Sequence, residues 1–143
     1  MPDLSLSQAQ TIVTAALAEA RRHAFKPLVV TVLDARGACK ALAAEDGASL
    51  KRAEIAHGKA YGALALGMGS RAIGKRAVEQ PYFVAAISHI ADGALVPVPG
   101  GVLVRDSGGA LLGAVGVSGD TSDNDEVAAL AGIAAAGLAA DPG

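Results

Sequence analysis

The fold of this chain is decided by one stretch, GGVLVRDSGGALLGAVGVSGDTSDNDE, which runs from Gly100 to Glu126. An apolar β-branched run at 102–104 is followed by a polar, glycine-containing turn at 105–109 and a second strand-like run at 111–117. Two such runs joined by a short glycine-rich turn predict an antiparallel β-hairpin.

Two glycines, Gly113 and Gly116, interrupt the second strand of this hairpin. Glycine weakens a strand and marks a bulge or a close approach to the backbone. Either a ligand approaches these positions, or a helix or neighbouring subunit lies flat on the strand. The residues alone leave both explanations open.

Helices and strands elsewhere follow from periodicity, turns and caps. Ser5 and Gln8 form a capping box for the first helix, and Ser49 is expected to cap the second. The predicted helices cover 6–23, 49–66, 70–78, 81–90 and 123–139, and the further extended segments cover 28–33, 39–43 and 95–98. Strand pairs joined by short turns predict an α+β fold, with an antiparallel sheet and helices packed on it.

Length and composition indicate a single domain over residues 1–143, because 143 residues suffice for one core. Hydrophobic residues make up 52% of the chain but aromatic residues only 3%, so Ala, Val, Leu and Ile must build that core. The net charge of −2 gives no basic surface for nucleic acid or a membrane.

One cysteine, Cys39, precludes an intrachain disulfide. The N-terminus is neither cationic nor followed by a run typical of a signal peptide, and no run reaches transmembrane length. We therefore expect a cytoplasmic protein.

Several familiar motifs do not fit. The glycines of the hairpin are not at a strand-to-helix turn, as a dinucleotide site requires, and no lysine follows a phosphate-binding loop. Ser118 ends a strand and is not part of a nucleophile elbow, so a serine triad with His57 and Asp120 is not indicated. Apart from His89 near Asp92, the histidines lack partners on the same helix face at the spacing of a zinc site, so such a site is not indicated.

Two residues of the second helix are candidate functional groups. Lys59 lies at the margin of the apolar helix face, so its ammonium either extends to solvent or points into a pocket and pairs with an anionic ligand group. His57 lies on another flank. A single histidine is either an ordinary surface residue or an axial ligand of haem iron, which needs one imidazole and an apolar slot.

Taken together, the motifs of the chain resemble the GlcG/HbpS-like family, which includes the C-terminal domain of PduO-type proteins. The resemblance extends from Leu4 to Gly137. The motifs that carry it are Val30-Thr31-Val32-Leu33-Asp34 with Gly37, Asp46-Gly47-Ala48, Ile55-Ala56-His57-Gly58-Lys59-Ala60, Gly100-Gly101, and Gly113-Ala114-Val115-Gly116-Val117-Ser118-Gly119 with Asp125-Glu126.

The resemblance implies a profilin-like fold, in which helices flank a five-stranded antiparallel sheet in α-β-α layers, and homo-oligomers of two or more copies. Some members bind haem or are linked to its degradation, so a small-molecule ligand, haem or a related tetrapyrrole, is expected. His57 would ligate the iron, and Lys59 and Arg105 would pair with propionates. The wider set of expected ligand-binding residues is Asp46, Lys59, Gly100, Gly101, Arg105 and Asp125.

A second hypothesis is a cofactor-independent enzyme of a catabolic pathway, an isomerase, tautomerase or lyase that acts by proton transfer. Glu45, Asp46, His57 and Lys59 flank one predicted strand-to-helix junction. Lys59 would hold a substrate carboxylate while Glu45 or His57 moves the proton. A third alternative is an assembly subunit, since oligomer interfaces tolerate the Ala- and Gly-rich surface of the chain.

Overall fold

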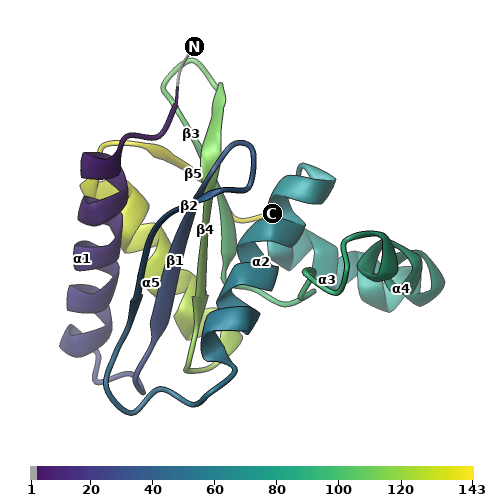
Figure 1. The fold of residues 1–143 in the computed structure, drawn as a ribbon, viewed down its shortest axis with the longest axis horizontal. Helices are drawn as coiled ribbons and strands as arrows, with labels where there is room; N and C mark the ends of the chain where they lie inside the picture. Colours follow the sequence, from purple (N-terminus) through teal and green to yellow (C-terminus); the bar gives the residue numbers. More distant parts are fainter. Residues whose placement is uncertain (1–2) are drawn as a thin grey trace.

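The computed structural model describes residues 3–143 (Figure 1). Met1 and Pro2, which belong to the predicted domain, lie outside the described residues. The elements in chain order are α1 (Leu6–Arg22), β1 (Val29–Asp34), β2 (Cys39–Ala44), α2 (Arg52–Leu66), α3 (Ser70–Glu79), α4 (Pro81–Ile90), β3 (Gly101–Arg105), β4 (Leu111–Ser118), α5 (Ser122–Ala135) and β5 (Ala139–Asp141).

The five strands form one antiparallel sheet in the order β2-β1-β4-β3-β5. The predicted hairpin is confirmed: β3 pairs with β4, the central strand, with Val102 opposite Val115. The register shifts between Val104 and Arg105, next to the hairpin turn. Strand β1 lies between β2 and β4, with helices on both of its faces, and all six of its residues are buried. The predicted α+β class and five-stranded antiparallel sheet are confirmed.

Helices cover both faces of this sheet (Figure 1). Because side chains alternate along a strand, Val102 and Val104 face the layer of α1 and α5, whereas Leu103 faces α2. Helix α1 begins as predicted, with Ser5 and Gln8 in a capping box, and buries a narrow stripe of small apolar residues. The sheet therefore lies between two apolar layers that contain no tryptophan.

The two strand glycines have different neighbours. A Cβ on Gly116 would collide with the carbonyl oxygen of Ala56 in α2, which confirms that a helix lies flat on the strand there. A Cβ on Gly113 would collide instead with the carbonyl oxygen of Leu33, in the neighbouring strand β1. Of these two glycines, Gly116 is the one that lets α2 lie close to the sheet.

The start of α2 differs from the prediction. The helix begins at Arg52, and its N-cap residue, Lys51, makes no side-chain cap hydrogen bond. Ser49 is not the cap: its hydroxyl accepts a hydrogen bond from the Arg52 guanidinium at 3.2 Å. The competing side-chain contact therefore determines where Ser49 points.

The C-terminal segment also differs. The last helix ends at Ala135, because Gly137 adopts a left-handed conformation, with φ of 72°, and the chain turns back. Residues 139–141 then pair with β3 as an edge strand, β5. The predicted extended segment 95–98 is not a strand of the sheet, although Val96 N–H donates to the carbonyl of Gly58.

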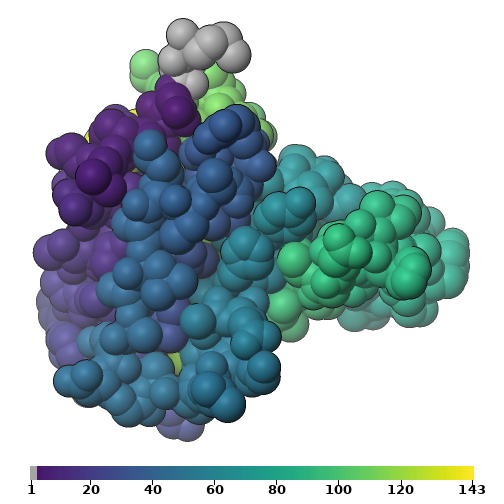
Figure 2. All heavy atoms as spheres, in the orientation of Figure 1, coloured from purple at the N-terminus to yellow at the C-terminus, as the bar shows by residue number. Residues whose placement is uncertain are grey.

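Helices α3 and α4 project from the side of the sandwich (Figure 1), and Figure 2 shows them as an arm that extends from the rest of the molecule. The sequence of α4 is almost entirely apolar, but only Val84 is buried. Tyr82 is 73% exposed and Ile90 is 74% exposed. In residues 3–143, no helix combines the length and the apolar character needed to cross a membrane.

The packing of α2 on β4 predicts the effect of a single added methyl group. We expect Gly116→Ala to lower the free energy of unfolding by about 3 kcal/mol or more, since backbone must move to relieve the collision with Ala56. Gly108→Ala, in the hairpin turn, is the control, because its added Cβ meets no atom closer than 3.4 Å. Urea unfolding measures both. Equal effects of the two variants would contradict this packing.

Candidate functional site

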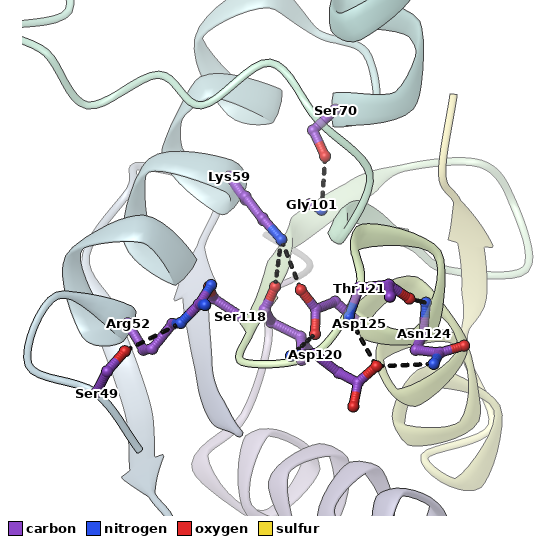
Figure 3. Close-up of polar contacts among 11 residues, drawn as sticks. Ser49, Arg52, Lys59, Ser70, Gly101, Ser118, Asp120, Thr121, Asn124 and Asp125 are labelled. Atoms are coloured by element: carbon purple, nitrogen blue, oxygen red, sulfur yellow. Dashed lines mark hydrogen bonds and ion pairs between the residues drawn. The ribbon is translucent and has the colours of Figure 1, made fainter. Parts of the chain in front are cut away.

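A buried lysine lies in a cluster of polar contacts between α2, the end of β4 and the start of α5 (Figure 3). Lys59, from the middle of α2, is 2% exposed. Its Nζ donates to the carbonyl oxygen of Val117 and to Oδ2 of Asp125, both at 2.9 Å. The ammonium therefore does not extend to solvent. The anionic group that it meets belongs to this chain.

Asp125 is equally buried and belongs to the first turn of α5. While Oδ2 binds Lys59, Oδ1 accepts the backbone N–H of Asp120 at 2.9 Å. A carboxylate near a helix N-terminus is stabilised by the helix dipole. Both oxygens of Asp125 are thus engaged by donors of the protein.

Burial dominates the ionisation of this pair. Removal from water lowers the pKa of the Lys59 ammonium from its ordinary value, although the Asp125 carboxylate opposes the shift. Burial likewise raises the pKa of the Asp125 carboxyl, with Lys59 opposing. Each pKa is thus shifted toward the neutral form of its group, as expected for a charge that is removed from water.

Two glycines make room for the lysine. A Cβ on Gly100 would lie 3.0 Å from Lys59 Nζ, and one on Gly101 would collide with the Lys59 carbonyl oxygen. Gly100 also has φ of 119°, a conformation that favours glycine. The N–H of Gly101 donates to the hydroxyl of Ser70 at 2.6 Å, at the start of α3. Gly100, Gly101 and Asp125 therefore all lie around Lys59.

A second cation, Arg52, lies at the start of the same helix. Its Nη1 donates to the hydroxyl of Ser118 at 3.2 Å, and its Nε donates to Ser49 (Figure 3). Sequence reasoning did not identify Arg52. The available signal was a basic residue after the Asp46-Gly47-Ala48 turn, but its proximity to Ser118 depends on the packing of α2 against β4.

Glu45 and Asp46, the two acidic residues before α2, lie away from Lys59. Glu45 pairs with Arg21 at 3.0 Å and accepts the N–H of Leu28. With Asp46, it lines an open cavity of about 400 Å³ whose other lining residues are Arg21, Pro27 and Ala44. This cavity contains neither His57 nor Lys59 in its lining. The arrangement does not support the hypothesis that requires all four in one pocket.

His57 lies in a different groove, which has a volume of about 410 Å³. Its ring stacks on Tyr61, with centroids 5.4 Å apart. The groove is lined by Leu42, Ala53, Glu54, His57, Asp92, Gly93 and Ala94. Most of this lining is apolar or small, and the only ring nitrogens it offers are those of His57.

Arg105 lies at the far end of β3 from Gly101. Its guanidinium pairs with Asp141 of β5 at 3.3 Å and donates to the carbonyl of Gly109. Arg105 therefore links β5 to the turn between β3 and β4, and it lies away from Lys59. Within the described chain, residues 3–143, no group of three or more His, Cys, Asp and Glu side chains could hold a metal ion.

These features define a class: an α+β protein with a five-stranded antiparallel sheet between helical layers and a buried ion pair at one end of the sheet. The family model described as "Haem degrading protein HbpS-like" matches residues 4–134. The chain belongs to this HbpS-like family, as its sequence motifs predicted. Comparison with curated proteins gave no match.

Solved structures agree with this assignment. The crystal structure of a PduOC:heme complex is 26% identical to this chain, with 96% of this chain and 97% of that chain covered and a TM-score of 0.85. A double mutant of Streptomyces reticuli HbpS is 26% identical, with 94% and 87% covered and a TM-score of 0.80. Klebsiella pneumoniae ORFY, 24% identical, covers 96% of this chain and 92% of its own, with a TM-score of 0.86, and shares the fold.

The buried pair predicts strong coupling between its members. Lys59→Met and Asp125→Asn should each lower the free energy of unfolding by about 3–5 kcal/mol, because each leaves one charge buried without its partner. The double variant should cost clearly less than the sum, as measured by urea unfolding.

The control for this cycle is Lys51→Met with Glu54→Gln, an exposed ion pair at the start of the same helix. Its members are 67% and 71% exposed, and we expect changes within about 0.5 kcal/mol. Additive effects of Lys59→Met and Asp125→Asn would show that the two charges do not depend on each other.

Proposed function

We propose that this protein binds haem or a related tetrapyrrole. The observation that carries the proposal is the likeness to the PduOC:heme complex, which extends over 96% of the chain at a TM-score of 0.85. The match to the HbpS-like family model supports it. The relatives thus support the choice of ligand, and the residues around His57 support its place in this chain.

The groove of His57 is the proposed site. It offers one imidazole, as haem iron requires, and an apolar wall of Leu42, Ala53 and Ala94 for the porphyrin face. Bound there, haem would supply its own redox and ligand chemistry, while the protein holds the iron through His57. Tyr61 stacks on the imidazole and thereby limits the ring's orientation.

The expected partners of the propionates are not at this groove. Lys59 is already bound to Asp125, and Arg105 is bound to Asp141. The groove's lining contains no arginine or lysine, and Lys51 beside it pairs with Glu54. Our proposal therefore assigns His57 to the iron and assigns no residue to the propionates.

Haem titration tests this proposal. Addition of haem to the wild-type protein should give a saturable Soret shift, and His57→Ala should weaken binding by about tenfold or more, since it removes the iron ligand. His23→Ala and His89→Ala, which change the other two histidines, are the matched controls and should bind as wild type. An absent shift in the wild type would refute haem binding. An unchanged affinity in His57→Ala would refute this site.

We also propose that the protein forms a homo-oligomer through the α3–α4 arm. Tyr82 and Ile90 expose large apolar side chains on α4, and Val78 at the end of α3 is 84% exposed. Burial of such surface is favourable, and the arm extends away from the chain's own core (Figure 2). A second copy is the proposed occupant, because the family resemblance implies assembly of identical subunits.

Light scattering of size-fractionated protein tests the oligomer. The wild type should have a mass of at least two chains, whereas Tyr82→Asp with Ile90→Asp should shift toward one chain, because charges at the contact disfavour burial. Leu50→Asp, which likewise replaces an exposed apolar side chain by a charged one, is the control, because Leu50 is 88% exposed and lies in the loop between β2 and α2. A monomeric wild type would contradict the proposal.

A further inference from the structure

A small polar cavity lies at the start of α2, on another flank of the helix from the His57 groove. Its volume is about 210 Å³. Three segments that are distant in the sequence meet there: the end of the α1–β1 loop, the β2–α2 loop and the end of β4. The lining residues are Lys26, Pro27, Gly47, Ala48, Ser49, Arg52 and Gly119.

Arg52 is the main charged group of this cavity. Its guanidinium has five N–H donors, and it uses two, toward Ser49 and Ser118. Among residues 3–143 it forms no ion pair with a carboxylate. Three donors on a planar fork therefore remain, the arrangement that binds two oxygen atoms of a carboxylate or phosphate.

Other groups around the cavity favour an anion as well. Lys26 is exposed and, within the described part of the chain, its side chain is in no ion pair. The Ser49 hydroxyl accepts from Arg52, so its own proton is available to donate. Helix α2 begins here without a side-chain cap, and its dipole adds positive potential.

Asp120 and Asp125, two carboxylates near this cavity, are already bound by donors of the protein (Figure 3), while Asp46, next to Gly47, lines the neighbouring open cavity with Glu45. Asp120 accepts the N–H of Lys26 at 2.7 Å, the N–H of Thr121 at 2.7 Å and Nδ2 of Asn124 at 2.8 Å. Asp125 is bound to Lys59. Asp120 offsets part of the charge of Lys26, but neither carboxylate lines the cavity or reaches Arg52 within ion-pair distance.

We propose that this cavity binds a small oxyanion, a carboxylate or phosphate group, through Arg52 with Lys26 and Ser49. The cavity's volume admits only a small molecule or the anionic end of a larger one. Arg52 and His57 are five residues apart on α2, roughly 140° around its axis, so the site is separate from the proposed haem groove. Haem binding is therefore not required for it.

The test uses ¹⁵N-labelled full-length protein titrated with sodium acetate and, separately, with sodium phosphate. Sodium chloride at equal ionic strength is the reference for screening effects. We expect saturable shifts of the amide resonances of Gly47, Ser49 and Gly119, which line the cavity. Saturation with acetate or with phosphate supports the site and identifies which oxyanion it takes.

Variants link the shifts to the cavity. Arg52→Gln should weaken binding by about tenfold or more, because it removes the positive charge and the guanidinium donors. Arg52→Lys should retain part of the binding, because it keeps the charge but not the planar pair of donors. Arg36→Gln is the matched control, since Arg36 is exposed and lies in another turn. If Arg52→Gln fails to fold, Lys26→Gln, on an exposed side chain, replaces it and should weaken binding severalfold. Shifts that sodium chloride reproduces, or that persist in these variants, would overturn the proposal.

Discussion

The ion pair of Lys59 and Asp125 is the constraint around which the rest of the structure is arranged. Lys59 comes from α2, on one face of the sheet, and Asp125 comes from α5, on the other. They meet at the end of β4, where the carbonyl of Val117 is the third member of the contact. A buried charge without its partner is strongly destabilising, so the two helical layers must keep one relative position.

This arrangement requires glycine at several positions around α2. Gly100 and Gly101 leave the space that the lysine and its backbone occupy, and Gly116 lets α2 approach the sheet. The chain has many alanines and glycines but 3% aromatic residues, so close contact between backbone layers replaces large side chains in the core. Such packing leaves little freedom for an added methyl group.

Helix α2 presents three chemically different groups in three directions. Lys59 points inward and is used by the protein itself, His57 lies in an open groove, and Arg52 faces a small polar cavity. One helix, held in position by its buried lysine, thus supports both proposed sites. The membership in the HbpS-like family fits the first of them, while the second depends on Arg52 in this chain.

The sequence by itself determined the α+β class, the central hairpin, the capped first helix and the family, because these depend on local periodicity, turn residues and motifs. It did not determine β5 or the start of α2, where pairing with β3 and the contact between Ser49 and Arg52 outweigh local preference. From the sequence, the Lys59 ammonium was expected either at the surface or in a pocket that binds an anionic ligand. Only the tertiary structure brings Asp125 to it, 66 positions along the chain, and separates it from Glu45 and His57. Such long-range contacts depend on how layers pack, which no local pattern encodes.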